Sequence, residues 1–350
     1  MVSIAIFLRK LFSKFASIRQ LIFLWHLRSR NLRIVRKQPN ELRYSQGQAN
    51  FPETEAILQL ARECFLREGY YPISFSWPKK FDETHNPKSK AISTTVPYVP
   101  YSFEDSDKYY GEYSISSLAI TQKKGGWDCF RHLEIIGSGC VPLFIDIEKI
   151  PKYTMIHYPK DLFRVVRKDY KRRSLLPSHD LTTNLIKYAN RNLTTQAMCR
   201  YFSELANLSI TPQDRILFVD SKLSSAPDYL SVFNFIGLKQ VYGDQVECLY
   251  EEPEYVYLDS TQDVSKLYGR GFGYTKVLNR SHVKSKPADS PALVIISNLA
   301  RDFRIVGSLK ITYPKTKFVL FWGQDIPIPY VIKEEVLRLT QGILFCREIY

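Results

Sequence analysis

Apolar residues in the first part of the chain recur at spacings of three and four. One narrow helical face carries Ile4, Leu8, Leu11, Phe15, Ile18, Ile22 and Trp25. The longest apolar runs there are five residues long, too short to cross a bilayer, and charges interrupt the apolar region that a cleavable signal peptide needs. The pattern therefore predicts an amphipathic basic helix in residues 1–37, followed by a polar linker in residues 38–50.

Beyond residue 50, short apolar runs alternate with helical patterns. Strands are expected at 115–121, 141–145, 215–220, 245–249, 293–297, 318–322 and 343–346. Helices are expected at 53–62, 103–113, 181–207, 229–242, 302–312 and 333–339, with an extended run at 72–77 and an exposed loop at 79–100. Such alternation favours parallel sheets. We therefore predict an α/β protein with two Rossmann-like domains, in residues 51–210 and 211–350, after the N-terminal helix and linker of residues 1–50.

Composition and charge agree with a folded protein that carries a basic arm. The chain has 350 residues, of which 45% are hydrophobic and 24% charged, so two domains with real cores are feasible. The formal net charge is +14, yet residues 1–37 alone hold nine Lys or Arg and no acid. The arm could lie on an anionic membrane surface or dock on the protein itself. Nucleic-acid binding is disfavoured, because the arm has little aromatic interleaving for base stacking.

The cysteines indicate where the protein works. Six are present, with no Cys-x-x-Cys sequence and no histidine at metal-ligand spacing. Free thiols in a reducing compartment are expected, with no zinc site and no disulfide framework. The predicted location is the cytoplasm, with peripheral membrane attachment through residues 1–37 as an extension of that prediction.

One stretch, residues 123–146, combines features that suit a phosphate-bearing ligand. It reads as loop, helix, tight turn and buried strand. Gly125 and Gly126 permit turns and a close approach of the backbone to a ligand. Asp128 is placed to cap the helix, and Arg131 and Glu134, three residues apart, share a neighbouring face. A glycine turn, a helix N-terminus and an arginine together favour an anionic ligand.

The same stretch resembles a known family. Its pattern Gly-Gly-Trp-Asp-x-x-Arg-x-x-Glu-Ile-x-x-x-Gly-Cys-Val-Pro-x-x-x-Asp is similar to the donor-binding segment of exostosin-like glycosyltransferases of the GT-B fold, above all bacterial and large-virus members. The resemblance implies that Arg131 contacts the diphosphate of a nucleotide sugar and Glu134 the sugar of the nucleotide. The implied donor-binding set is Gly125, Gly126, Arg131 and Glu134, with Lys123, Lys124 and Asp128 as secondary candidates.

The second half resembles the acceptor-side domain of the same enzymes, at residues 216–220, 228–231 and 268–272. In that family the acceptor domain usually comes first, so this chain looks permuted. A faint repeat 280 residues apart, with Glu55, Phe65, Arg67, Glu68 and Tyr70 matching Glu335, Phe345, Arg347, Glu348 and Tyr350, agrees with permutation or with chance. Permutation predicts that residues 343–347 form a strand beside 318–322 or 293–297. It also predicts that Tyr350 lies near the interdomain cleft.

Enzymes of this kind typically hold the diphosphate with basic groups rather than a metal ion, so no metal and no cofactor besides the nucleotide-sugar donor substrate is expected. If the enzyme inverts, a base must accept the proton of the acceptor hydroxyl. Asp325 and Asp220 each follow a predicted strand, where open α/β sheets place ligand contacts. Glu348 and His132 are lesser candidates, and His132 reads better as a structural residue.

The implied function is transfer of a sugar from a nucleotide sugar to a glycan or lipid-linked acceptor. The alternative is a catalytically inactive sugar-nucleotide-binding or scaffold protein at a membrane surface, because the donor motif is present while the base is not assigned. A nucleic-acid-binding protein is suggested only by the net charge, and steep salt dependence of binding would be its signature.

Overall fold

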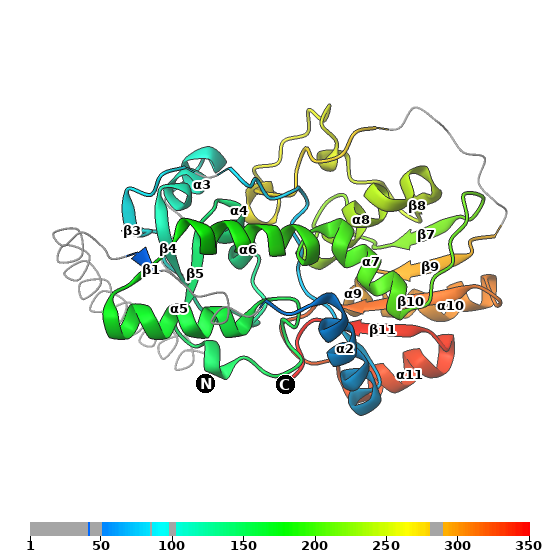
Figure 1. Ribbon diagram of the computed structural model, residues 1–350. Coiled ribbons are helices and arrows are strands. Elements are labelled where there is room, and N and C mark those ends of the chain that lie inside the picture. Colours follow the sequence, from blue (N-terminus) through cyan, green and yellow to red (C-terminus); the bar gives the residue numbers. More distant parts are fainter. Residues whose placement is uncertain (1–40, 43–50, 85, 98–102, 281–289) are drawn as a thin grey trace, which may run out of the picture.

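The structure is a computed structural model that describes residues 41–42, 51–84, 86–97, 103–280 and 290–350. The predicted N-terminal amphipathic helix lies outside the described residues. Within them, the predicted α/β class with parallel sheets is confirmed: Figure 1 shows a small sheet at the left and a larger one at the right. No helix among the described residues has both the length and the apolar character needed to cross a membrane.

The larger sheet has six parallel strands in the order β2-β11-β10-β9-β7-β8. Its strands are β2 (Tyr71–Pro72), β7 (Ile216–Val219), β8 (Val246–Cys248), β9 (Leu293–Ile296), β10 (Lys317–Trp322) and β11 (Ile343–Cys346). The smaller sheet is parallel too, in the order β3-β4-β5, with β3 (Lys90–Ile92), β4 (Ser116–Thr121) and β5 (Val141–Phe144). A short parallel pair, β1 (Glu41–Leu42) and β6 (Leu176–Pro177), completes the strands described.

The helices also follow the predicted alternation. They are α2 (Thr54–Glu68), α3 (Ser106–Ser114), α4 (Arg131–Gly137), α5 (Lys160–Arg173), α6 (His179–Asn192), α7 (Thr195–Leu205), α8 (Tyr229–Tyr242), α9 (Leu299–Asp302), α10 (Val306–Thr312) and α11 (Tyr330–Thr340). Short 3₁₀ turns connect several of them, including Phe303–Ile305 between α9 and α10.

The central strands are buried on both faces, which explains their continuous apolar sequence. On β7, Ile216 and Phe218 pack in one hydrophobic cluster with buried residues of α7 and α8. Leu217 and Val219, which point the other way, pack in a second cluster with residues of α9, α10 and α11. The six-stranded sheet is therefore covered by helices on each side.

Three local predictions were wrong. Residues 79–100 are not all exposed loop, because β3 pairs with β4 and buries Ala91 and Ile92. The helix expected at 181–207 is two helices, broken at Leu193–Thr194, where the Thr194 side chain accepts a hydrogen bond from Ala197 N and so caps α7. The first helix extends six residues past the predicted end, to Glu68, and stops at Gly69 with φ 77°.

Two segments far apart in the sequence, β2 and β11, meet in the larger sheet. Tyr71 and Pro72 of β2 pair with Phe345 and Cys346 of β11, so an early segment lies in a sheet otherwise built from residues after 210. The strand predicted at 343–347 is confirmed, and it lies beside β10 as expected.

The end of the chain lies against the motif loop. The Tyr350 hydroxyl lies 3.0 Å from Lys123 Nζ, and the backbone N of Ile349 donates to Thr154 Oγ1 at 2.9 Å, so the last residues contact the motif side of the molecule. The sequence repeat does not reflect equivalent structure. Phe65 lies in helix α2, whereas its counterpart Phe345 lies in strand β11.

Candidate functional site

A cleft of about 860 Å³ lies at the carboxyl ends of β10 and β11, against the motif that precedes and begins α4. Its lining comes from the motif (Lys124, Gly125, Gly126, Asp128, Cys129, Phe130, Arg131, Glu134), from residues 227–229, 266–270 and 323–326, and from Phe75 and Arg347. Ligands of open α/β folds bind at this edge of a sheet. Six of the seven predicted donor-binding residues and one of the two predicted bases therefore share one cleft.

The two motif glycines are required by close packing rather than by backbone angles. A Cβ on Gly126 would lie 2.8 Å from Glu348 Cδ and 2.9 Å from an Arg347 guanidinium nitrogen. A Cβ on Gly125 would overlap the Asp325 carboxylate. Side chains rarely tolerate contacts of this kind, so only glycine lets the motif loop approach the residues that follow β10 and β11.

Asp128 does not cap the helix, contrary to prediction. The residue before α4 is Phe130, which makes no side-chain cap, and Asp128 Oδ2 instead accepts a hydrogen bond from Phe75 N at 2.6 Å. The backbone N of Asp128 donates to Glu348 Oε1 at 2.9 Å. Burial raises the pKa of Asp128 to about 7, although the nearby Arg347 opposes this. Asp128 thus ties the motif to the segments that follow β2 and β11.

Arg131 and Glu134 lie on the first turn of α4 and are almost fully buried, with 4% and 5% of their surfaces exposed. Glu134 accepts hydrogen bonds from the hydroxyls of Tyr109, at 3.0 Å, and Tyr110, at 3.3 Å. Burial raises the pKa of Glu134 to about 7, and Arg131 opposes this shift. Alanine at either position would therefore disturb the packing of a buried site as well as any contact with a ligand.

Two positive charges converge at the motif. The pKa of Lys124 is lowered by burial and by the charge of Arg131. An anionic ligand between them would relieve this repulsion. Helix α4 has only seven residues, so an anion in the cleft would meet positive charge from these side chains rather than from the helix end.

The raised pKa of Glu134 predicts how stability depends on pH. Its ordinary pKa is 4.5 and its folded value about 7, so between these values the unfolded chain loses a proton that the folded protein keeps. The contribution of Glu134 to stability should fall as pH rises through this window, by roughly 1.4 kcal/mol per pH unit at most. Glu134→Gln should not share this loss, and it should gain stability relative to wild type as pH rises.

Urea unfolding of both proteins between pH 4 and 8, roughly the span over which the group titrates, measures this difference. Glu335→Gln, at an exposed position of α11, is the matched control and should follow the wild-type curve. Parallel curves for wild type and Glu134→Gln would contradict the buried, protonated state of Glu134.

Two predicted site residues lie elsewhere. Lys123 does not line the cleft; its Nζ lies over the rings of Trp127 and Tyr350. Asp220 is also outside the lining, and its carboxylate accepts hydrogen bonds from Ser231 Oγ at 2.6 Å and from Arg301 at 2.8 Å. Its side chain is wholly buried. Asp220 is therefore held as a structural acid and is a poor candidate for a base that touches substrate.

The other candidate base, Asp325, lines the cleft, and 56% of its side chain is exposed. It forms an ion pair with Arg347. Of the lesser candidates, Glu348 is fully buried beside Arg347. His132 is buried between Thr121 Oγ1 and Trp127 O, both at 2.9 Å, and burial lowers its pKa to about 3, as suits a structural histidine.

Sequence reasoning missed part of the cleft. Asp228 caps α8 by accepting from Ser231 N at 2.9 Å, and burial raises its pKa to about 6. Gly269 and Arg270, which also line the cleft, form a turn with φ values of 60° and 58°. Such left-handed angles are strained for arginine and tend to mark functional loops. The sequence did carry a signal for both segments, because residues 228–231 and 268–272 are among those that resemble the acceptor-side domain.

Among the described residues, no group of three or more His, Cys, Asp or Glu side chains is arranged to hold a metal ion. Asp105-Ser106-Asp107 has the spacing of a metal-binding Asp-x-Asp sequence. Here Asp105 is the cap of α3 and accepts from Asp107 N at 2.7 Å. Neither aspartate lines the cleft.

Comparisons with known proteins add no relative. Neither a scan of family models, nor a search of curated proteins, nor a search of solved structures found a significant match to the chain.

Proposed function

We propose that the protein is a glycosyltransferase that binds a nucleotide sugar in this cleft and transfers the sugar to an acceptor hydroxyl. The observation that carries the proposal is the meeting of the motif residues with Asp325 and residues 266–270, which are far apart in sequence, around one cavity. Its volume of about 860 Å³ falls within the range of small-molecule sites.

The motif side of the cleft has the groups that a nucleotide diphosphate needs. Arg131 offers a planar pair of N–H donors that match phosphate oxygens, and Lys124 adds a second positive charge. Both charges would stabilise the diphosphate as it leaves the sugar. Glu134, beside Arg131, would accept hydrogen bonds from ribose hydroxyls, and Gly125 and Gly126 let the motif loop pack against Asp325, Arg347 and Glu348 at the cleft.

The acceptor hydroxyl needs a base, and the cleft offers two. Asp325 is the more exposed. Asp228 is half-buried at the cleft wall, and its pKa is raised to about 6 by desolvation, close to the value at which a carboxylate accepts a proton efficiently near neutral pH. The acceptor would be a glycan or a lipid-linked saccharide, approaching from the side of residues 266–270.

A second candidate, a sugar-nucleotide-binding scaffold without transferase activity, is favoured by one observation. Both carboxylates already have partners: Asp325 pairs with Arg347, and Asp228 accepts from Ser231 N and from the Asn298 amide. Release of free nucleotide, measured with and without an acceptor saccharide, separates a transferase from a scaffold. Asp325→Asn and Asp228→Asn should then show which carboxylate turnover needs while nucleotide-sugar binding persists.

Binding is tested first with a panel of nucleotide sugars and thermal unfolding. At least one member should raise the melting temperature, because a ligand that binds only the folded state stabilises it. Arg131→Lys keeps the charge but loses the paired donors. It should weaken binding of that ligand by about tenfold or more in calorimetric titration.

The matched control for this test is Arg200→Lys, at an exposed position of α7 remote from the cleft lining. It should bind as the wild type does. If no nucleotide sugar binds, or if Arg131→Lys binds unchanged, the proposal is wrong.

A further inference from the structure

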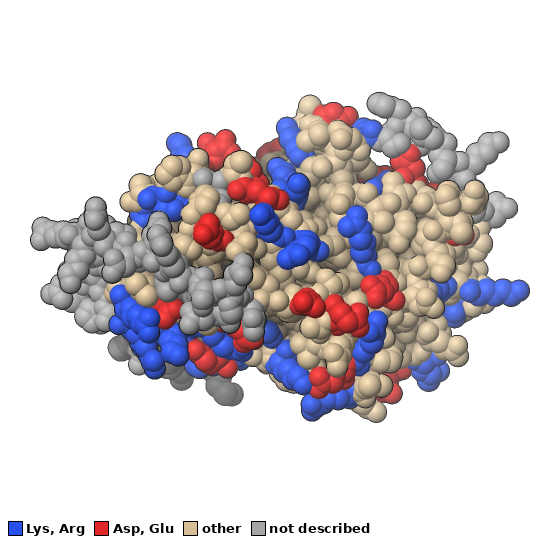
Figure 2. Space-filling view, viewed as in Figure 1, with Lys and Arg blue, Asp and Glu red and all other residues tan. Residues whose placement is uncertain are grey.

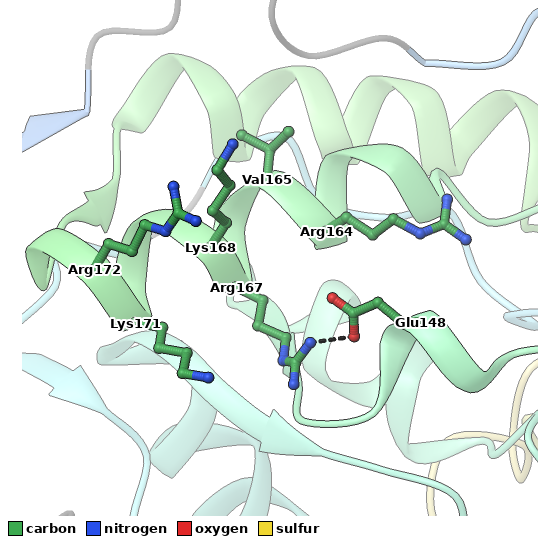
Figure 3. A pocket seen from close by; sticks show the side chains of 7 residues that line it. All are labelled: Glu148, Arg164, Val165, Arg167, Lys168, Lys171 and Arg172. Atoms are coloured by element: carbon green, nitrogen blue, oxygen red, sulfur yellow. Dashed lines mark hydrogen bonds and ion pairs between the residues drawn. The ribbon is translucent and has the colours of Figure 1, made fainter.

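A second concave surface, separate from the cleft, is lined by cations. It has a volume of about 620 Å³ and is bordered by Arg164, Val165, Arg167, Lys168, Lys171 and Arg172 of α5, together with Glu148. Figure 3 shows these basic side chains leaving one helix, with Arg167 turned to Glu148. Five positive charges thus face one negative charge.

The arrangement follows from the periodicity of α5. Leu162, Phe163, Val166 and Tyr170 are buried, whereas Arg164, Lys168, Lys171 and Arg172 fall on the opposite side of the helix. In the space-filling view, Lys and Arg side chains gather over α5 (Figure 2). The apolar face therefore packs α5 against the protein, and the basic face points to solvent.

Part of this charge is not balanced within the described protein. Arg167 pairs with Glu148 and Arg164 with Asp161. Lys168, Lys171 and Arg172 form no hydrogen bond or ion pair with any residue that the structure describes. The first 40 residues of the sequence contain no Asp or Glu, so that segment has no carboxylate to neutralise them.

We propose that this basic surface of α5 binds the phosphate headgroups of an anionic lipid membrane. Charge complementarity points to an anion, and cations spread along one helix suit a surface of many headgroups. No aromatic side chain lines the surface, so the stacking contacts typical of single-stranded nucleic acid are missing. The basic sequence of residues 1–37 would act on the same membrane, and the two elements together would orient the protein.

The test uses the full-length chain and co-sedimentation with vesicles. Vesicles of phosphatidylglycerol and phosphatidylcholine should bind the wild type, and binding should weaken as salt rises because salt screens surface charge. The triple change Lys168→Gln, Lys171→Gln and Arg172→Gln should weaken binding by about 100-fold, since each basic residue near an anionic surface contributes roughly a factor of five.

The matched control is Lys79→Gln, Lys80→Gln and Lys315→Gln, which removes the same charge at exposed positions away from α5. It should bind like the wild type. Circular dichroism of each variant establishes that it is folded; the changes are at exposed sites and glutamine is a good helix former.

Four outcomes would overturn the proposal. The α5 variant could bind as tightly as the wild type, or the control could lose as much affinity. Phosphatidylcholine vesicles alone could bind equally well. Inorganic phosphate at matched ionic strength could release the protein from vesicles, which would identify a small-anion site instead. None of these measurements depends on nucleotide-sugar binding, so failure here leaves the proposed transferase function standing.

Discussion

Replacing Arg347 with methionine should destabilise the protein by about 3–5 kcal/mol, because it removes the cation that pairs with a cluster of carboxylates, of which Asp128 and Glu348 are buried. In the described structure the Arg347 side chain is 2% exposed. It donates to Gly323 O at 2.9 Å, to Asp128 O at 2.6 Å and to Glu348 Oε1 at 3.0 Å, and it pairs with Asp325. Methionine keeps much of the packing and none of these bonds.

The loss of stability caused by Arg347→Met should increase as pH rises. Burial raises the pKa of both Asp128 and Glu348, and the charge of Arg347 opposes each shift. Without Arg347 both pKa values should rise further. The variant should therefore be closest to wild type in acid, where the carboxyls are protonated in both states, and lose more stability as pH rises.

Urea unfolding at several pH values measures this effect. Arg338→Met, at an exposed position on α11, removes an arginine without a buried partner and should change stability by less than about 0.5 kcal/mol. If the Arg347 variant were as stable as this control, the ion cluster would not hold the motif to β11 and the loop after β10.

Replacing Gly126 with alanine should cost about 1–3 kcal/mol of stability and abolish nucleotide-sugar binding, because the added methyl group overpacks a rigid site. The added Cβ would lie 2.9 Å from Arg347 Nη1 and 2.8 Å from Glu348 Cδ. Both side chains are buried and hydrogen-bonded, so neither can move away without breaking those bonds.

Gly111→Ala is the matched control for Gly126→Ala. Gly111 lies inside α3, and a Cβ there would meet no atom within 4 Å. Alanine should stabilise that helix by about 0.5–1 kcal/mol. The melting temperature from thermal unfolding and the affinity from calorimetric titration should therefore both be lower for Gly126→Ala than for Gly111→Ala. Equal stability would show that the close approach of the motif loop to residues 347–348 is not tight.

Sequence reasoning succeeded where a single local pattern decides the structure. The strands β7 and β9 are fully buried, so their apolar runs are unambiguous, and helix α8 matches its predicted bounds of 229–242. It failed where the signal is polar or short. Strand β3 has only three residues and begins with Lys90. Helix α5 is so rich in Lys and Arg that its buried face was not recognised.

For the candidate site, the motif located one wall of the cleft, but only tertiary structure decides which acids face it. Asp220 and Asp228 lie eight residues apart around the same βα turn. Asp220 is held by Arg301, whereas Asp228 lines the cleft. Both have a polar side chain near a strand end, so spacing alone cannot distinguish them. Arg347, the centre of the buried cluster, carried no sequence signal beyond the faint repeat.

The pairing of β2 with β11 has a consequence for how the chain folds as it is synthesised. The two strands are more than 270 residues apart in sequence and are neighbours in the sheet. On the ribosome, residues 71–72 have no partner strand until residues 343–346 have emerged. Such distant contacts make folding slow and leave apolar surface exposed meanwhile. Helix α2, which packs beside β2, cannot complete its packing before β11 is present either. We therefore expect the nascent chain to depend on chaperones until β11 has been synthesised.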